Sequence, residues 1–251
     1  MFTVTTREGI EANLHPAELA GADVVCCRSL KRPEGESGGP IRRVLEGLGL
    51  SCGCFVPDRT EAARGGVPVG LAILTGIGIW PLNSGRLRIA GEDRDTGSLA
   101  QFMHLRKQNA SLLVLNLRLD PSPEEQHTLL GAVFAHPLFK ERYSGVVLCG
   151  DRRVAVGERV LRSLARSVSW AYCPVPTGDY GPLLFVPGNG QNIPTTVYPV
   201  APPDLNAAER GRTLALRIRR QPVKRSDRVR VPLSYREQWL GGQECFRAFV
   251  L

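Results

Sequence analysis

The stretch Gly145-Val-Val-Leu-Cys-Gly-Asp-Arg-Arg153 decides the fold of this 251-residue chain. Its four apolar residues lie between two glycines, which is typical of a strand that is covered on both faces. Gly150 permits a sharp turn, and Asp151 is expected at the carboxyl end of that strand. Taken alone, the Gly-Asp pair is also typical of a plain turn after a core strand, so the stretch needs support from the rest of the chain.

Composition favours a folded protein with a sizeable core. Hydrophobic residues make up 43% of the chain. No apolar run approaches the ~20 residues of a membrane span, and residues 1–8 lack a basic segment followed by an apolar one. No repeat or clear linker interrupts the sequence, so we expect a single domain over residues 1–251 and no membrane association.

The cysteines indicate the redox environment. There are seven, an odd number, and most lie inside apolar runs. They therefore predict reduced, buried thiols and an intracellular, reducing compartment, with cytosol, nucleus and organelle left open. Cys52 and Cys54 form an isolated pair without a second pair at ligand spacing, which argues against zinc.

Positive charge is concentrated near the carboxyl end. The net charge is +8, and residues 210–230 hold nine basic residues against one acid, Asp227. A strand pattern follows in this segment, because the apolar residues Leu214, Leu216 and Ile218 alternate with Ala215, Arg217 and Arg219. This alternation predicts that Arg217 and Arg219 lie on one face. The segment is expected to contact nucleic acid, RNA before DNA, or an acidic protein partner in a larger complex; a solvated face is the alternative. The candidate contact residues are Arg210, Arg212, Arg217, Arg219, Arg220, Lys224 and Arg225.

Hydrophobic periodicity predicts strands alternating with helices, and therefore the α/β class. The expected strands cover residues 2–6, 22–27, 67–80, 111–116, 145–150, 183–186 and 214–219. The expected helices cover residues 41–48, 121–139 and 157–170, with a weaker helical pattern at 10–20.

Six short motifs follow one another along the chain. They are Thr5-Thr6-Arg7 and residues 22–29, 70–76, 115–119, 150–153 and 226–228. In this order they resemble the S/T-x-N, aDIVclQE, GvaIlSr, vNTHL, GDFN and SDH motifs of the endonuclease/exonuclease/phosphatase superfamily. The resemblance implies a four-layered α/β sandwich of two mixed sheets flanked by helices, whose active members cleave phosphate esters with a divalent metal.

The polar positions inside these motifs depart from the family pattern. The metal-binding Asn of the first motif falls on Arg7, and the metal-binding Glu falls on Ser29. In the fourth motif Asn116 is kept, but the His falls on Arg118. The Asn of GDFN falls on Arg153 and the general-base His on Arg228, so that only Asp151 and Asp227 remain of the acids.

Arginine cannot replace the residues that the family uses. Mg²⁺ needs hard oxygen ligands, whereas a guanidinium offers only donors and a permanent positive charge. Its pKa, above ~12, also excludes a general base near neutral pH. The resemblance thus implies a degenerate site with no bound metal or other cofactor.

Three interpretations follow from the sequence. The first is a catalytically inactive protein of this fold with a structural or binding role in a ribonucleoprotein or other large assembly. It predicts that Arg7, Arg118, Arg153 and Arg228 converge near Asp151 and Asp227. The second is an active phosphodiesterase or nuclease that uses Mg²⁺, Asp151, Asp227 and further acids such as Asp23, Glu92 or Asp95. The third is an unrelated α/β protein.

Overall fold

The computed structural model describes residues 1–8, 22–31, 45, 49–57, 69–87, 99–118, 123–150, 158–174, 182–188, 195–200 and 212–220. Within them the chain forms two mixed sheets of six strands each. This is the α/β class that the sequence predicted.

The first sheet has the strand order β11-β12-β1-β2-β4-β3. Its strands are β1 (Phe2–Glu8), β2 (Val24–Lys31), β3 (Cys52–Pro57), β4 (Val69–Thr75), β11 (Thr195–Val200) and β12 (Thr213–Arg220). The second sheet has the order β5-β6-β7-β8-β10-β9. Its strands are β5 (Trp80–Arg86), β6 (Leu99–Lys107), β7 (Ala110–Arg118), β8 (Gly145–Gly150), β9 (Trp170–Cys173) and β10 (Leu183–Pro187).

Both sheets follow one plan. Each has a central parallel pair, β1 with β2 and β7 with β8, with two antiparallel strands on either side. A parallel pair needs a crossover connection. Between β7 and β8 the crossover contains helix α3 (Pro123–Ala135) and the 3₁₀ turn η2 (Pro137–Lys140). Helix α4 (Glu158–Ser167) lies between β8 and β9.

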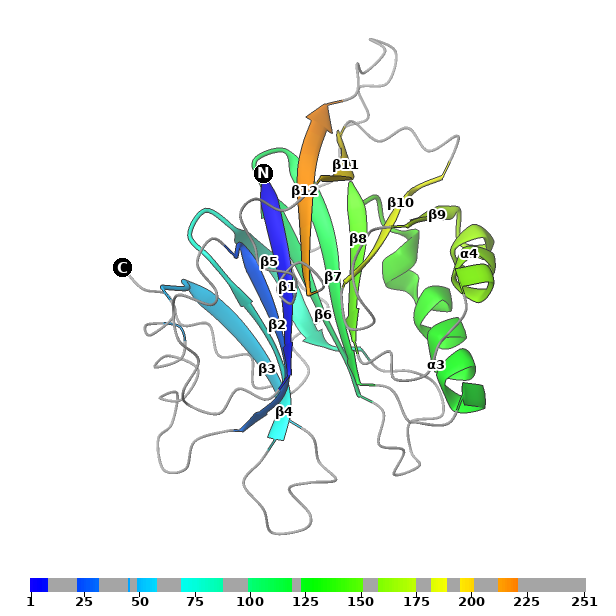
Figure 1. Ribbon diagram of the computed structural model, residues 1–251, viewed down its shortest axis with the longest axis horizontal. Coiled ribbons are helices and arrows are strands. Elements are labelled where there is room, and N and C mark those ends of the chain that lie inside the picture. Colours follow the sequence, from blue (N-terminus) through cyan, green and yellow to red (C-terminus); the bar gives the residue numbers. More distant parts are fainter. Residues whose placement is uncertain are drawn as a thin grey trace.

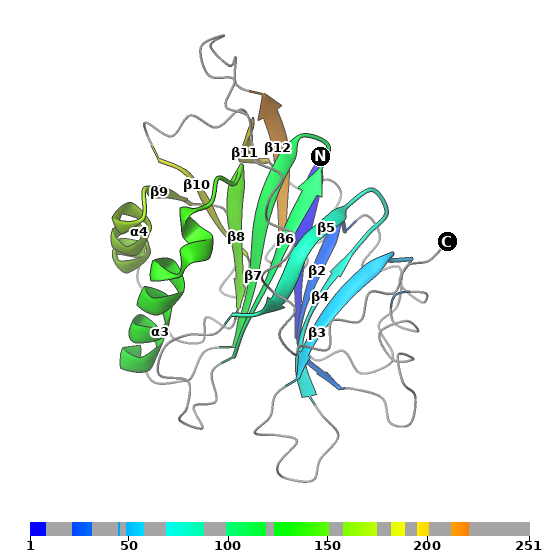
Figure 2. The ribbon, with the colours of Figure 1, turned by 180° about the vertical axis from the view of Figure 1, so that it is seen from behind.

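Three apolar layers hold these elements together. The central cluster lies between the two sheets and takes residues such as Val4, Cys26, Val114 and Leu216. An outer cluster packs the second sheet against α3 and α4, which Figures 1 and 2 both show on the side away from the first sheet. A smaller cluster covers the other face of the first sheet, where Leu45, in helical conformation, is buried.

The expected strands and the helices at 121–139 and 157–170 are confirmed apart from their exact ends, with one error; of the helix expected at 41–48 only Leu45 is described. The strand expected at 67–80 is wrong, because β4 ends at Thr75 and β5 begins at Trp80. Gly78, with φ of +82°, lies in the turn between them, where a residue without a Cβ is favoured. The run of apolar residues concealed this turn. β3, β6, β9 and β11 were not expected, and residues 10–20 lie outside the described part.

The described cysteines agree with the expected reduced thiols. Cys26, Cys27, Cys54 and Cys149 are buried thiols, and Cys52 and Cys173 are partly buried thiols. Burial, followed by the neighbouring Cys149, raises the pKa of Cys26 well above its usual value. No helix in the described ranges is long and apolar enough to cross a membrane.

Candidate functional site

The carboxyl ends of both parallel pairs meet at one end of the sandwich, which we call the carboxyl edge. In the first sheet Arg7 stands beside Cys27, and in the second Leu117 stands beside Gly150. The Asn116 side chain joins them, because its Nδ2 donates to the backbone oxygens of Cys27, at 2.9 Å, and Ala72, at 3.1 Å. The last residues of β1, β2, β7 and β8 therefore share one edge.

Two buried amides bridge the sheets at this edge. Asn116 on β7 and Gln101 on β6 stand opposite each other, and both side chains are fully buried. The Nε2 of Gln101 donates to the Cys54 backbone oxygen at 2.7 Å. Since the partners are carbonyl oxygens, each amide nitrogen must face the first sheet. The Oδ1 of Asn116 and the Oε1 of Gln101 are buried and have no hydrogen-bond partner within the described residues.

Arg28 is buried at the same edge, a residue that the sequence analysis passed over. Successive side chains of β2 point to opposite faces of the first sheet, and Val24 and Cys26 belong to the central cluster. Arg28 therefore lies on the inter-sheet face, and it is only 5% exposed. The pairing of β2 with β4 shifts between Cys27 and Leu30, and Ser29 takes a φ of +54° in this irregularity. The period-two pattern was the signal that could have found Arg28.

Two further arginines lie on the inter-sheet face. Arg86 on β5 stands opposite Gln101, and Arg118 on β7 stands opposite Leu99, a residue of the central cluster. Residues directly opposite in a ladder share a face. Both arginines are partly buried. We call Arg28, Arg86, Gln101, Asn116 and Arg118 the arginine-amide site. Nothing in the sequence pointed to Arg86, because the strand expected at 67–80 ended at Trp80 and no strand was expected over residues 81–86.

The structure brings only some of the predicted site residues together. Asn116 and Arg118 lie in the arginine-amide site, and Ser29 is beside Arg28. Only the backbone of Arg7 is described, and it pairs with Cys27 of β2. Asp151, Arg153, Asp227 and Arg228 lie outside the described residues. The expected convergence of arginines around the two aspartates therefore stays a prediction.

The basic face expected on the C-terminal strand is present. Arg217 and Arg219 on β12 are exposed, whereas Leu214 and Leu216 belong to the central cluster, so the arginines face outward from the first sheet. Arg212 precedes the strand and is exposed. Of Arg220 only the backbone is described, and Arg210, Lys224 and Arg225 lie outside the described part.

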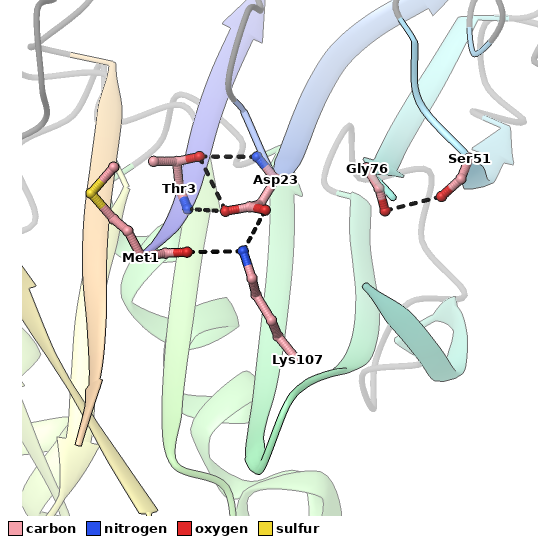
Figure 3. Close-up of polar contacts among 6 residues, drawn as sticks. All are labelled: Met1, Thr3, Asp23, Ser51, Gly76 and Lys107. Carbon is pink, nitrogen blue, oxygen red and sulfur yellow. Dashed lines mark hydrogen bonds and ion pairs between the residues drawn. The ribbon is translucent and has the colours of Figure 1, made fainter. Parts of the chain in front are cut away.

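Asp23 does not join the carboxyl edge. It precedes β2, at the opposite end of that strand, and its carboxylate accepts from the Thr3 backbone nitrogen at 2.8 Å and from Lys107 Nζ at 2.6 Å (Figure 3). Asp23 therefore makes a structural contact, and it does not contribute to the catalytic site of the active phosphodiesterase interpretation. Glu92 and Asp95 lie outside the described residues.

The arginine-amide site does not fit a divalent cation. Three of its five side chains are guanidinium groups, which repel a cation and offer it no lone pair. The two amide oxygens are suitable ligand atoms, but Mg²⁺ sites in proteins also use carboxylates. Within the described ranges no group of three or more His, Cys, Asp or Glu residues could hold a metal ion. Guanidinium groups instead suit an anion, because they donate in a fork that matches its oxygens.

Comparison with solved structures shows the fold of the endonuclease/exonuclease/phosphatase superfamily. The human Nocturnin catalytic domain, solved with a bound sulfate anion, is 13% identical, with 88% of this chain and 93% of that chain covered at a TM-score of 0.55. A mannosyl-6-phosphatase from Bacteroides thetaiotaomicron is 10% identical (87% and 99% covered, TM-score 0.50). An endonuclease/exonuclease/phosphatase family protein from the same organism is also 10% identical (86% and 96% covered, TM-score 0.50). No family model and no curated protein matches the sequence.

Proposed function

We propose that this chain is a catalytically inactive protein of the endonuclease/exonuclease/phosphatase fold that binds nucleic acid, RNA in preference to DNA, within a larger ribonucleoprotein assembly. The observation that carries the proposal is the arginine-amide site. It lies at the edge where the resemblance places a metal and its carboxylate ligands, and it holds Arg28, Arg86 and Arg118 there.

The chemistry of these groups favours binding over hydrolysis. A guanidinium stays protonated near neutral pH, so it neither ligates a metal nor activates water. It does donate in a fork that matches phosphate oxygens. Arg86 and Arg118 are the partly exposed members of the site, so they are the groups that a phosphate of a nucleic acid can reach at this edge.

The basic face of β12 supplies a second contact in this proposal. Arg217 stands opposite Tyr198 on β11, and both side chains are exposed. Arginines beside an aromatic ring suit a nucleic-acid strand, because the cations contact phosphates and the ring can stack on a base. The sulfate anion bound to the Nocturnin catalytic domain shows that a protein of similar fold takes up an oxyanion.

Binding is tested with a fluorescent single-stranded RNA. Replacing Arg217 and Arg219 with Gln should weaken binding several-fold and flatten its dependence on salt, since each lost phosphate contact lowers the slope by ~0.7. The matched control replaces Lys140 and Arg142, two exposed cations that precede β8. An equal loss in both variants would mean that only total charge matters, which would contradict a specific surface.

Catalysis is tested with a generic phosphodiester in Mg²⁺ or Mn²⁺. We expect no metal-dependent hydrolysis above the buffer rate, and no difference between the wild type and Asp151→Ala. Calorimetry should likewise show no saturable binding of either metal.

The alternative is an active metal-dependent phosphodiesterase or nuclease that uses Asp151 and Asp227. It is favoured by the end of β8 at Gly150, on the carboxyl edge, because Asp151 is the next residue in the sequence. The mannosyl-6-phosphatase also shows that a protein of similar fold cleaves a phosphate ester. Hydrolysis or metal binding that is abolished by Asp151→Ala would establish this alternative.

A further inference from the structure

A second group of arginines lies on helix α4, away from the arginine-amide site. Arg159, Arg162 and Arg166 are exposed, and together with Ser163 they line an open hollow of about 660 Å³. We call these three arginines the α4 stripe. Neither the basic segment nor the motifs of the sequence included them.

The helix holds the stripe on a fixed support. Positions 159, 162 and 166 are three and four residues apart, so they share one helix face. On the opposite face Leu161 and Ala165 are buried in the outer cluster against the second sheet. At 1.5 Å of rise per residue the stripe extends over roughly 10 Å. A row of cations of this length fits consecutive phosphates better than one small anion.

The middle arginine is oriented before any ligand arrives. The Arg162 guanidinium lies over the Tyr172 ring, with 5.8 Å between its carbon and the ring centroid. Tyr172 in turn packs on Phe185, with ring centroids 5.6 Å apart. Such stacking reduces the conformational freedom that a partner must remove on binding.

The surroundings of the stripe favour nucleic acid over a membrane or a protein. Helices that lie on membranes and the centres of protein interfaces both present large apolar side chains. Within the described residues the exposed large hydrophobic side chains are Met1, Ile77, Trp80, Leu82 and Tyr198, none of which is on α4. The surface offers guanidinium groups and a hydroxyl, which are donors for phosphate oxygens.

We propose that the α4 stripe binds consecutive phosphates of an RNA strand. The inference rests on the proposed function for the choice of RNA, but it concerns a different surface. Arg217 and Arg219 face outward from the first sheet, whereas α4 covers the outside of the second sheet (Figures 1 and 2). The two basic surfaces therefore face away from each other, and the protein can hold two RNA segments apart.

The experiment measures the anisotropy of a labelled oligouridylate of about 12 nucleotides with the full chain, at salt concentrations of about 50 to 300 mM. The stripe variant combines Arg159→Gln, Arg162→Gln and Arg166→Gln. Its control combines Arg106→Gln, Lys140→Gln and Arg142→Gln, which removes the same charge from exposed positions elsewhere. Circular dichroism confirms that both variants fold.

The stripe variant should raise the Kd about tenfold or more and lower the salt slope by about two, as expected for three lost phosphate contacts, while the control changes Kd less than twofold. Equal Kd values for the two variants would overturn the inference. Polyglutamate that competes as well as RNA for the stripe would overturn it in favour of an acidic protein.

The Arg217→Gln, Arg219→Gln variant separates this inference from the proposed function. If that variant loses binding and the stripe variant does not, the inference fails and the proposed function stands. If only the stripe variant loses binding, the inference stands without the β12 surface. A wild-type protein that does not bind RNA at the lowest salt rejects both.

Discussion

At the scale of single residues, Asn116 shows how a buried polar group ties the two sheets together. It donates to two backbone oxygens of the first sheet, whereas Gln101 donates to one. Replacing Asn116 with Leu should lower the free energy of unfolding by about 2–3 kcal/mol, and Gln101→Leu by about 1–2 kcal/mol, because buried oxygens lose their donors. Urea denaturation of both variants measures the difference. A larger loss for Gln101→Leu would contradict this account.

His104 makes stability depend on pH. Its Nε2 lies 2.6 Å from Ser111 Oγ, its ring meets Tyr143 edge to face at 5.0 Å, and burial lowers its pKa to about 4. The unfolded chain, with a histidine pKa near ~6.5, takes up a proton first as the pH falls. The stability that neutral His104 contributes is therefore complete above that pH and is lost between pH 6.5 and 4.

Replacing His104 with Gln should remove this part of the pH dependence. The wild type should lose about 1–3 kcal/mol of unfolding free energy more than His104→Gln between pH 7 and pH 4. Denaturant titrations at several pH values measure the loss. His127→Gln, at an exposed position of α3, is the control and should follow the wild type. Parallel curves for all three proteins would contradict the prediction.

At the scale of elements, two glycines should respond in opposite ways to the same substitution. A Cβ on Gly145, at the start of β8, would overlap the Val197 side chain of the first sheet, whereas a Cβ on Gly131 inside α3 meets nothing within 4 Å. Gly145→Ala should lower the free energy of unfolding by about 1–3 kcal/mol. Gly131→Ala should raise it by about 0.5–1 kcal/mol, because Ala has the higher helix propensity. Thermal and urea unfolding measure both. Adding Val197→Ala to Gly145→Ala should restore part of the lost free energy of unfolding. If it restores none, the overlap with Val197 is not the cause of the loss.

At the scale of the whole molecule, polar contacts join the sheets at both ends. The arginine-amide site contains the bridges at the carboxyl edge. At the other end Lys107 on β6 contacts Asp23 and donates to the Met1 backbone oxygen at 2.9 Å, while Ser51 Oγ donates to Gly76 within the first sheet (Figure 3). The side chains of Lys107 and Asp23 are both 19% exposed, so solvent screens the ion pair only in part.

Asp23→Asn should destabilise the protein by about 1–2 kcal/mol, because the carboxylate also accepts from Thr3. Combining it with Lys107→Met in a double-mutant cycle should give a coupling of at least ~0.5 kcal/mol. Combining it with Asn116→Leu should give an additive loss, since the two sites lie at opposite ends. Coupling between Asp23→Asn and Asn116→Leu, without coupling between Asp23→Asn and Lys107→Met, would contradict the independence of the contacts at the two ends.

Features that depend on local periodicity could be predicted from the amino-acid sequence. Buried strands such as β8 and amphipathic helices such as α4 follow from apolar spacing, because burial of one face needs no knowledge of the partner. The same reasoning set Arg217 and Arg219 on one face of β12. The order of the motifs indicated the two mixed sheets, and it drew attention to Asn116 and Arg118, which lie near the end of β7.

Only the tertiary structure decided which polar residues meet. Gln101 is fully buried because its donor reaches Cys54, 47 residues away in the sequence, on the other sheet. Leu30 lies on the outer face of the first sheet, although simple alternation from Cys26 would turn it inward, because the pairing of β2 with β4 shifts between Cys27 and Leu30. Arg86 reaches the site because β5 pairs with β6 opposite Gln101. Each outcome depends on strand register between distant segments, and register is set by packing across the sandwich, which no local pattern in the chain encodes.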